Sequence, residues 1–473
     1  MMLVPENILL VHNRMGISTA IASAVIIIII VVGGVGVYFY YSSTTSSTST
    51  SKSSAAATTG CWTPSTAPAP VVPTNAGGQS TVAGASTPAT GKSIAVVFDV
   101  GGLGDRGFND LAYAGMMDAN KTFGVDYSYE VAQSTSDFPT DYAALIAKHP
   151  SLIVGVGFDQ DQIISQMASQ YPNQLFAQVD GDIYNVSNVI AIKFQENVGS
   201  AIDAALAVAM SKTNTIGFIG GMSTGIIYKF WNGWKCGAEW ADSYLSKVDG
   251  KAVNTTLLQQ YTGPTPAAFD EPSIDTSIAQ SMISQHADVV FTAAGGSGIG
   301  GLDAVGTYDE SQGWNWSNST APPVFGIGVD ADQDYIGTYQ YFKLNENSTS
   351  FTGFTPPSFI ITSEIKKVDV GVFNVMKAVV YGNVSNFWTN PAKWAPSFWL
   401  GQTDLCGNNG NTTCAGTRNV YLLGWAQGAV GPTNFSYSAV YLTPLAKQVL
   451  TNIEQGIDNG TISIPENYNP SGN

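Results

Sequence analysis

The stretch Lys92-Ser-Ile-Ala-Val-Val-Phe-Asp99 is a short apolar run that ends on an acidic residue. An amphipathic stretch follows at 109–123, and a second apolar run, Ser151-Leu-Ile-Val-Gly-Val-Gly157, comes later in the chain. Short apolar runs that alternate with longer amphipathic segments are typical of a parallel sheet with crossover helices. We therefore expect an α/β protein. The same pattern predicts further strands at 175–179, 215–219, 287–293 and 324–328.

Polar residues and glycines follow these predicted strands at their carboxyl ends. Open α/β sheets bind ligands at this edge, because loops and helix N-termini converge there. One such residue alone is more typical of a helix cap or a turn, but the repetition at strand after strand favours a binding site. The residues in this position are Asp99, Asp180, Gly220, Gly221, Gly295 and Asp330.

Chain length and charge narrow the classes of function. With 473 residues, the chain is expected to form two or more domains. The formal net charge of −16 argues against nucleic acid as a partner, since phosphate binding needs clustered Lys and Arg. An enzyme is disfavoured because there is no His-Glu-x-x-His or Walker motif, although Gly296-Ser-Gly298-Ile-Gly-Gly301 matches the weak Gly-x-Gly-x-x-Gly pattern. Nothing in the sequence indicates a cofactor or a metal site.

Charged residues make up only 11% of the chain, so Asn, Ser, Thr and Gly must cover much of the surface. Many of the asparagines lie in Asn-x-Ser/Thr sequons, which predicts a glycoprotein, although an Asn- and Thr-rich chain also forms sequons by chance. The sequons begin at Asn120, Asn185, Asn254, Asn315, Asn318, Asn347, Asn383, Asn411, Asn434 and Asn459.

The N-terminal region predicts a membrane anchor. Residues 15–41 carry no charge and, at about 1.5 Å per residue, can cross a hydrocarbon core of roughly 30 Å. Arg14 precedes this run and positive charge returns only at Lys52, so residues 1–14 are expected inside the cell and the remainder outside. A cleaved secretory signal peptide is the alternative. The segment also resembles archaeal class III signals, in which cleavage after a glycine such as Gly16 leaves the helix in place.

A tether and a disulfide loop are also predicted. Residues 42–92 are mostly Ser, Thr, Ala, Pro and Gly, which predicts a disordered stalk. Cys406 and Cys414 are close in sequence, and outside the cell a small disulfide loop is the natural interpretation. Metal binding is the rival, but it lacks a nearby His. Cys61 and Cys236 could pair or stay free.

One motif carries a family resemblance. The run Phe98-Asp99-Val-Gly-Gly-Leu-Gly-Asp105-Arg-Gly-Phe108-Asn109 resembles the opening motif of the purine-nucleoside receptors in the basic membrane protein family of ABC-importer substrate-binding proteins. The similarity extends over about 93–465. Arg106-Gly107 departs from it, since a Lys-Ser pair is common there, and extra residues lie around 312–323 and 349–357. Further matching motifs follow in the same order at 155–158, 171–180, 211–213, 217–221, 230–234, 294–298, 328–333 and 362–366.

The resemblance implies a type I periplasmic-binding-protein fold. In this fold, two Rossmann-like lobes are joined by three crossover strands and enclose the ligand between them. We expect lobe 1 to comprise 93–198 and 325–362, and lobe 2 to comprise 199–324 and 363–473.

The resemblance also implies a site in which two phenylalanines, Phe108 and Phe269, hold a purine. Aromatic faces stack on a base with about 1–3 kcal/mol each, and carboxylates accept vicinal ribose hydroxyls. Phe158 and Trp234 are candidates for packing behind the site. The polar positions implied are Asp99, Asn109, Asp180, Gly295, Asp330 and Lys366.

Each site residue also has an ordinary structural interpretation. Phe108 and Phe269 could be core residues, Asp330 a turn residue, and Lys366 a surface lysine that alignment confuses with Lys367. The expected function is capture of a nucleoside for an ABC permease and its ATPase, by a monomeric binding unit on the outer face of the cell membrane. The alternatives are another small solute such as a sugar, or a surface sensor or structural protein of the same fold.

Overall fold

A computed structural model of the chain describes six segments. They are residues 51–52, 91–183, 186–317, 320–344, 353–381 and 420–466. The predicted anchor at 15–41 and nearly all of the predicted stalk lie outside them, as do Cys61, Cys406 and Cys414. Within the described segments, no helix combines the length and the apolar character that crossing a bilayer requires. Cys236 is buried and disulfide-bonded, so it is not a free thiol.

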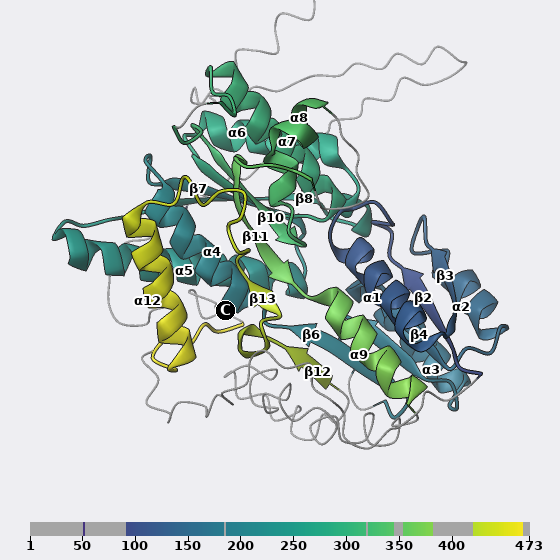
Figure 1. The fold of residues 1–473 in the computed structure, drawn as a ribbon. Coiled ribbons are helices and arrows are strands. Elements are labelled where there is room, and N and C mark those ends of the chain that lie inside the picture. Colours follow the sequence, from purple (N-terminus) through teal and green to yellow (C-terminus); the bar gives the residue numbers. More distant parts are fainter. Residues whose placement is uncertain are drawn as a thin grey trace, which may run out of the picture. The chain divides into compact units, whose positions relative to one another are not determined.

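The first lobe is built on a six-stranded parallel sheet with the order β12-β6-β5-β4-β2-β3 (Figure 1). Its central strands are buried at every residue, as expected of a sheet with helices on both faces. The strands are β2 (Ser93–Phe98), β3 (Asp126–Val131), β4 (Leu152–Val156), β5 (Phe176–Val179), β6 (Val189–Phe194) and β12 (Val420–Leu423). The helices are α1 (Phe108–Phe123), α2 (Phe138–Ile146), η2 (Phe158–Gln160), α3 (Asp161–Gln170) and α9 (Val368–Val380).

The second lobe contains a seven-stranded sheet with the order β1-β8-β7-β9-β10-β11-β13, parallel except for its two edge strands. The strands are β1 (Ser51–Lys52), β7 (Thr215–Met222), β8 (Thr256–Gly263), β9 (Val289–Ala293), β10 (Phe325–Asp330), β11 (Ile360–Lys366) and β13 (Val430–Gly431). The helices are α4 (Glu196–Met210), α5 (Gly225–Asp249), η3 (Pro266–Phe269), α6 (Pro272–Ser284), α7 (Gly296–Ser311), η4 (Asp334–Gly337), α8 (Tyr339–Leu344), η7 (Trp425–Gln427) and α12 (Pro444–Asp458).

Three connections between the sheets lie side by side. β6 continues into α4 through Gln195, β11 into α9 through Lys367, and β12 into β13 through 424–429. The Gln195 amide donates to the Leu423 carbonyl at 3.0 Å, and the Lys367 amide donates to the Ala429 carbonyl at 2.9 Å. The lobes are therefore joined by three short strands at one end of the cleft, as the resemblance implies.

The sheet topology corrects the predicted division into lobes. β10 pairs with both β9 and β11, so the described residues within 325–362 belong to the second lobe and not to the first. Conversely, α9 packs on α1, and β12 pairs with β6, so 368–380 and 420–423 contribute to the first lobe. The apolar pattern identifies a buried strand, but it carries no information about which sheet the strand joins.

The start of α1 shows how local sequence shapes the site. The Asp105 carboxylate accepts hydrogen bonds from the backbone amides of Gly107, Asn109 and Asp110 at 2.8–3.2 Å. These amides have no partner within the helix, and an acidic side chain at this end also interacts favourably with the helix dipole. The interaction fixes the first turn of α1, where Phe108 and Asn109 lie.

Candidate ligand-binding site

A cavity of about 540 Å³, a volume that includes its open mouth, lies between the two lobes at the carboxyl ends of the strands. All eight ligand-binding positions predicted from the sequence line this one cavity: Asp99, Phe108, Asn109, Asp180, Phe269, Gly295, Asp330 and Lys366. The first lobe contributes Asp99, Phe108, Asn109 and Asp180, whereas the second contributes the other four.

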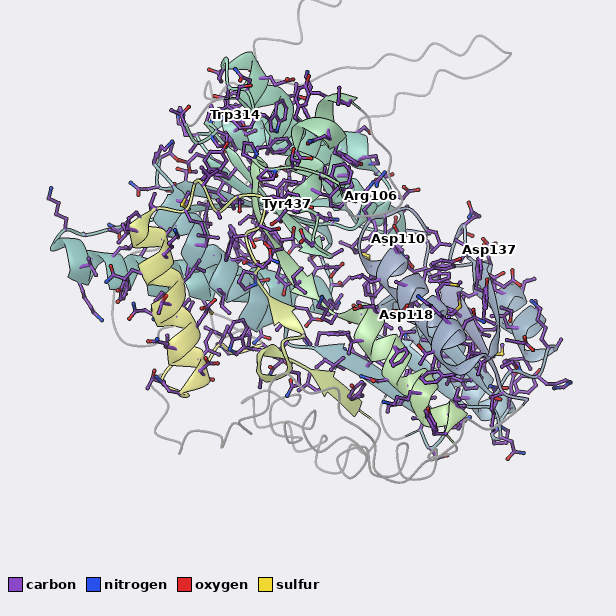
Figure 2. All side chains as sticks on the ribbon, viewed as in Figure 1. Arg106, Asp110, Asp118, Asp137, Trp314 and Tyr437 are labelled. Atoms are coloured by element: carbon purple, nitrogen blue, oxygen red, sulfur yellow. The ribbon has the colours of Figure 1, made fainter. Side chains whose placement is uncertain are left out.

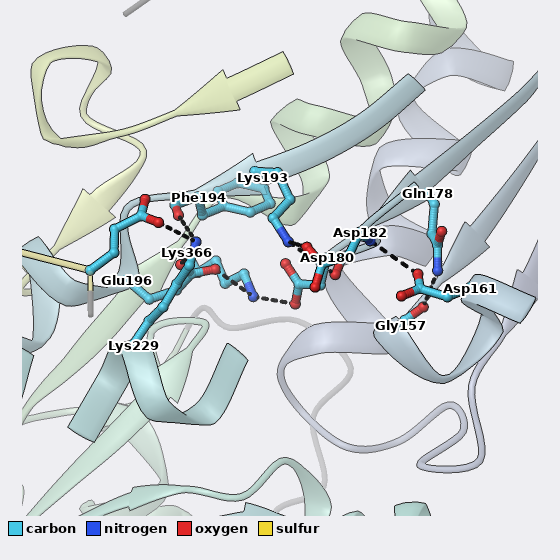
Figure 3. A network of polar contacts seen from close by, with 11 residues as sticks. Gly157, Asp161, Gln178, Asp180, Asp182, Lys193, Phe194, Glu196, Lys229 and Lys366 are labelled. Atoms are coloured by element: carbon cyan, nitrogen blue, oxygen red, sulfur yellow. Dashed lines mark hydrogen bonds and ion pairs between the residues drawn. The ribbon is translucent and has the colours of Figure 1, made fainter. Parts of the chain in front are cut away.

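Lys366, at the end of β11, is only 1% exposed and is therefore not a surface lysine. Its Nζ lies 2.5 Å from Asp180 Oδ2 and 3.2 Å from Glu196 Oε1 (Figure 3). Burial lowers the pKa of Lys366, but Asp180, Glu196 and Asp330 raise it further, so the net pKa lies above the ordinary value. The lysine is thus a permanent cation at the cavity wall, 4.9 Å from the centre of the Phe108 ring.

The ion pairs continue behind Lys366 and away from the cavity. Lys229 Nζ lies 3.5 Å from Glu196 Oε2 and 3.6 Å from Glu466 Oε2. Burial raises the pKa of Glu196, but Lys229 and Lys366 lower it, and the net pKa is below the ordinary value. Glu196 is therefore an ionised anchor for Lys366. Sequence reasoning missed Glu196 and Lys229, since they lie on α4 and α5 without any motif.

Asp180 and Asp330 occupy equivalent places at the ends of β5 and β10. Both have a left-handed backbone, with φ of 62° and 63°, which is uncommon for a residue other than glycine and clusters at functional sites. Lys193 Nζ donates to the Asp180 carbonyl at 3.3 Å and thereby holds this conformation. Oδ1 of each aspartate is buried and accepts no hydrogen bond from the described residues. Both aspartates line the cavity, and each therefore has one carboxylate oxygen whose hydrogen bonds the described residues do not satisfy.

Burial shifts the titration of the cavity carboxyls. It raises the pKa of Asp330 to about 7, although Lys366 opposes the change. It raises the pKa of Asp105 to about 6, against the hydrogen bonds from the amides of α1. Burial also raises the pKa of Asp99, and it raises that of Asp159, which does not line the cavity but is raised further by the neighbouring Asp99 carboxyl. The cavity therefore holds carboxyl groups that can be neutral near physiological pH.

Asn109 lies in the cavity wall, but its amide is already engaged by the protein. Its Nδ2 donates to Asp99 Oδ1 at 2.8 Å and to Asp105 Oδ2 at 3.1 Å, while its Oδ1 accepts from the Asp99 amide at 3.3 Å. The amide of Gly101 also donates to Asp99 Oδ1, at 2.9 Å. Asn109 therefore orients the Asp99 carboxylate, and Asp99 Oδ2 is the atom left for other contacts.

Aromatic side chains enter the cavity from both lobes. Phe108 begins α1 in the first lobe, and Phe269 ends η3 in the second. Phe269 packs directly on Gly221, where any side chain would collide with its ring. Phe158, predicted only as packing, lines the cavity itself and meets Phe269 edge to face, with ring centres 6.2 Å apart. Trp234, by contrast, is buried in the core and does not line the cavity.

Apart from Asp105, the remaining lining residues are apolar or small, and none of them was predicted as a ligand contact. Ile226, Ile227 and Phe230 come from the first turns of α5, and Gly296 begins α7. They lie on helices that follow strands β7 and β9, which is the position a parallel α/β fold assigns to ligand contacts. The glycine-rich run at 296–301 is explained by packing, because Gly300 lies directly against the Pro272 carbonyl of α6.

A second short motif, Gly221-Met-Ser223-Thr-Gly225, has the Gly-x-Ser-x-Gly spacing of a nucleophile elbow and lies between β7 and α5. A catalytic serine needs a base within hydrogen-bond reach. Ser223 is exposed, and its hydroxyl donates to Tyr228 Oη at 3.4 Å. Neither of the described histidines, His149 and His286, is its partner. The serine has the sequence context of a nucleophile but not its activating contact.

Two parallel-sheet lobes around a cavity define the periplasmic-binding-protein-like class of fold. A crystal structure of an ABC transporter solute-binding protein from Aeropyrum pernix K1 resembles the chain with a TM-score of 0.59 and 21% identity. The match covers 80% of this chain and 94% of that one. A transcriptional activator of the comK gene from Bacillus halodurans has a TM-score of 0.51 at 18% identity, covering 78% of this chain and 99% of that one. At these identities the likeness concerns the fold alone.

The family follows from the sequence. Residues 92–394 match the model described as ABC transporter substrate-binding protein PnrA-like, and the chain belongs to this family. It is 32% identical over 290 residues to the ABC transporter nucleoside-binding protein BmpA of Lactococcus lactis, covering 60% of this chain and 74% of that protein. It is also 32% identical over 294 residues to an uncharacterized lipoprotein of Pyrococcus abyssi, covering 61% of this chain and 64% of that protein. The family resemblance stated from the motifs is thus confirmed.

Proposed function

We propose that this protein is an extracytoplasmic solute-binding protein that captures a nucleoside, with purine nucleosides preferred, and delivers it to an ABC importer. The observation that carries the proposal is the combination of Phe108 and Phe269 from opposite lobes with the unsatisfied oxygens of Asp180 and Asp330 in one cavity. The name of the Lactococcus relative, which is described as nucleoside-binding, supports the same ligand class.

The aromatic pair suits a flat, apolar ring. Phe108 and Phe269 reach the cavity from separate lobes, so closure of the cleft brings both onto a ligand between them. Such rings stack on a nucleobase with about 1–3 kcal/mol each, irrespective of the base. The neighbouring Phe158, Phe230, Ile226 and Ile227 add apolar surface that excludes water from the base. Most of the affinity for the base would then come from stacking and burial.

The carboxylates suit the ribose. Asp180 Oδ1 and Asp330 Oδ1 are buried acceptors, and a nucleoside offers hydroxyl donors that would satisfy them. Burial raises the pKa of Asp180, whereas Lys366, whose Nζ lies 2.5 Å from Asp180 Oδ2, lowers it and holds the carboxyl group in position. A ligand without hydroxyl groups would leave these oxygens unpaired, at a cost of about 1–3 kcal/mol for each. The polar part of the cavity therefore selects a polyhydroxylated group.

The charge of the cavity disfavours phosphorylated ligands. Four aspartates, Asp99, Asp105, Asp180 and Asp330, line it with a single lysine. Lys366 is already paired with Asp180 and Glu196. A phosphate would meet carboxylates without a free cation, and burying like charges together is costly. We therefore expect nucleosides to bind and nucleotides to be rejected.

The setting that we propose follows from the sequence. Residues 15–41 anchor the protein in the membrane as a single span, residues 42–92 form a glycosylated stalk, and the binding lobes work outside the cell. An ABC permease with its ATPase is the partner that receives the ligand. The description of the Pyrococcus relative as a lipoprotein agrees with attachment to a membrane. The Cys406–Cys414 loop stays a prediction.

Calorimetry on a form that begins at about residue 93 tests the proposal. Inosine, adenosine and guanosine are titrated beside uridine, AMP and several free sugars. We expect micromolar or tighter binding of at least one purine nucleoside, lost in Asp330→Ala and retained in Asp118→Ala, which alters an exposed carboxylate on α1. Binding of a sugar without any nucleoside would overturn the nucleoside and leave the transport proposal. No ligand at all would favour a sensor or structural role.

A further inference from the structure

Arg106 reaches from the first lobe to the second at the edge of the cavity (Figure 2). It lies on the loop between β2 and α1, and its Nη1 donates to Tyr335 Oη on η4 at 3.4 Å. Its Cζ lies 5.0 Å from the centre of the Tyr341 ring on α8. The backbone carbonyl of Arg106 accepts a hydrogen bond from Gln333 Nε2 at 3.2 Å. One residue of the first lobe thus makes three kinds of contact with the second.

The loop that carries Arg106 is held in place by acidic side chains. The two carboxylate oxygens of Asp110 accept hydrogen bonds from the amides of Gly104 and Arg106, at 2.8 and 3.0 Å. Arg106 has a φ of 56°, which is uncommon for a residue other than glycine. The turn directs its side chain away from α1 and toward the other lobe. The arginine is therefore positioned before the lobes meet, which lowers the entropy cost of the contact.

The surface that receives Arg106 is equally ordered. Tyr335 is buried, and its ring centre lies 5.4 Å from that of Tyr341 and 5.1 Å from that of Phe354. Gln333 is tied to its own lobe, because its Oε1 accepts from the Val329 backbone amide at 3.0 Å and its own backbone amide donates to Ser363 Oγ at 3.0 Å. The two tyrosines and Gln333 form a receptor, named here the tyrosine receptor, that belongs wholly to the second lobe.

Contacts beside Arg106 connect this bridge to the ligand cavity. Gly107 lies against Val329 and Asp330. A Cβ added to Gly107 would lie 3.5 Å from the Val329 carbonyl oxygen and 3.7 Å from Asp330 Cβ. Phe108, which lines the cavity, is the next residue. When Arg106 is seated on the tyrosine receptor, the start of α1 lies beside Asp330. The same movement that seats the arginine thus brings two cavity residues together.

We propose that Arg106 and the tyrosine receptor are a latch that holds the two lobes closed and determines how long a bound ligand stays. The latch proposal rests on one part of the proposed function, namely that the ligand binds between the two lobes. A contact made in the closed state alone shifts the open–closed equilibrium by its own free energy, and the apparent affinity changes by the same factor. Arg106 is thus a positioning residue and not a ligand contact.

The chemistry of the latch gives the expected size of the effect. A guanidinium over an aromatic face and a hydrogen bond to a phenol are each modest when half-buried. Together they account for about a tenfold change in the closed population. Burial lowers the pKa of Arg106, but the hydrogen bond to Tyr335 and the field of the tyrosines raise it, with a net increase. The Arg106 guanidinium therefore stays positively charged across the physiological range of pH.

Distance measurements on the full chain in detergent test the latch without any ligand. Spin labels are placed through non-cysteine unnatural residues at Tyr127 in the first lobe and Val248 in the second, both of which are exposed. We expect Arg106→Met and Tyr341→Leu to shift the distance distribution toward open lobes relative to wild type. Lys343→Met is the matched control, since Lys343 lies on the same helix α8 but pairs with Glu310 inside the second lobe.

Dissociation kinetics with inosine provide the second measurement. Arg106→Met should increase the dissociation rate about tenfold with little change in the association rate, and Tyr335→Phe should have a smaller effect because it removes only the hydroxyl. Equal distances and equal rates in Arg106→Met, Tyr341→Leu and Lys343→Met would overturn the latch. If wild type binds none of inosine, adenosine and guanosine, the nucleoside proposal fails, while the distances still decide the latch. Tyr341→Leu serves as the test if Arg106→Met does not fold.

Discussion

Lys366 Nζ lies 2.5 Å from Asp180 Oδ2 and so joins the end of β11 in the second lobe to the end of β5 in the first. The pair is buried, and Glu196 completes it from behind at 3.2 Å. A buried ion pair contributes little net stability, but removal of one partner leaves an uncompensated charge. The three residues lie beside the connections between the two sheets. They therefore link the stability of these connections to the shape of the cavity.

Replacement of this lysine should be costly for both stability and binding. We expect Lys366→Met to lower the free energy of unfolding by about 3–5 kcal/mol, because Asp180 and Glu196 lose their cation. Urea unfolding measures the change. Lys367→Met is the matched control and should stay within about 0.5 kcal/mol, since its side chain lies outside the network. Equal stabilities of the two variants would contradict the role of Lys366.

The aromatic residues of the cavity should determine the affinity for a purine. Phe108→Leu and Phe269→Leu each remove one stacking face, worth about 1–3 kcal/mol, which corresponds to about 5- to 150-fold in the dissociation constant. Calorimetry with the best-bound nucleoside measures it. Phe373→Leu is a suitable comparison, because Phe373 stacks on Phe123 of α1 with ring centres 5.2 Å apart and does not line the cavity. An unchanged affinity in both cavity variants would exclude the sandwich.

Stability should fall as the pH rises from about 4 to 7. Burial raises the pKa of Asp330 to about 7, so the folded protein holds this proton more tightly than the unfolded chain. The contribution is complete below about pH 4, where both states are protonated, and is lost as the pH passes through 7. Asp330→Asn should reduce the slope of the unfolding free energy by up to about 1.4 kcal/mol per pH unit. Identical slopes for wild type and Asp330→Asn would refute the assignment, and Asp118→Asn controls for surface charge.

Gly221 should tolerate no side chain without loss of binding. A Cβ there would collide with the ring of Phe269, so Gly221→Ala must displace the phenylalanine from the cavity wall. We expect a loss of stability of about 1–3 kcal/mol, typical of overpacking, together with weaker nucleoside binding. Gly225→Ala has open space around its Cβ position and should leave binding unchanged. Thermal unfolding and calorimetry on the two variants decide the point.

Residues at strand ends could be predicted because their positions depend only on local pattern. Asp99, Asp180, Gly295 and Asp330 each follow a short apolar run, and the carboxyl ends of parallel strands meet at one edge of a sheet. All four line the cavity. The sequence predicted only in part which of the two lobes each of these residues belongs to. The apolar pattern indicates that β10 is buried, but pairing with β9 places it in the second sheet.

Other features of the site depend on contacts between segments that are remote in sequence. Glu196 and Lys229 lie in no motif, and Glu196 pairs with both Lys229 and Lys366 only because α4 packs on α5 beside β11. In the sequence, Arg106 stands out only because the family commonly has a different residue there. Its contacts with Tyr335 and Tyr341 span more than 200 residues of chain, as the separation of 229 positions between Arg106 and Tyr335 shows.

The amino-acid sequence by itself determined the α/β class, the family and eight of the residues that line the cavity, because these depend on local hydrophobic pattern and on motifs at strand ends. Only the tertiary structure decided which sheet β10 and β11 join, which charges surround Lys366 and how Arg106 bridges the lobes. The physical reason is that pairing, burial and electrostatic neighbourhood are set by long-range packing, which no local stretch of chain encodes on its own.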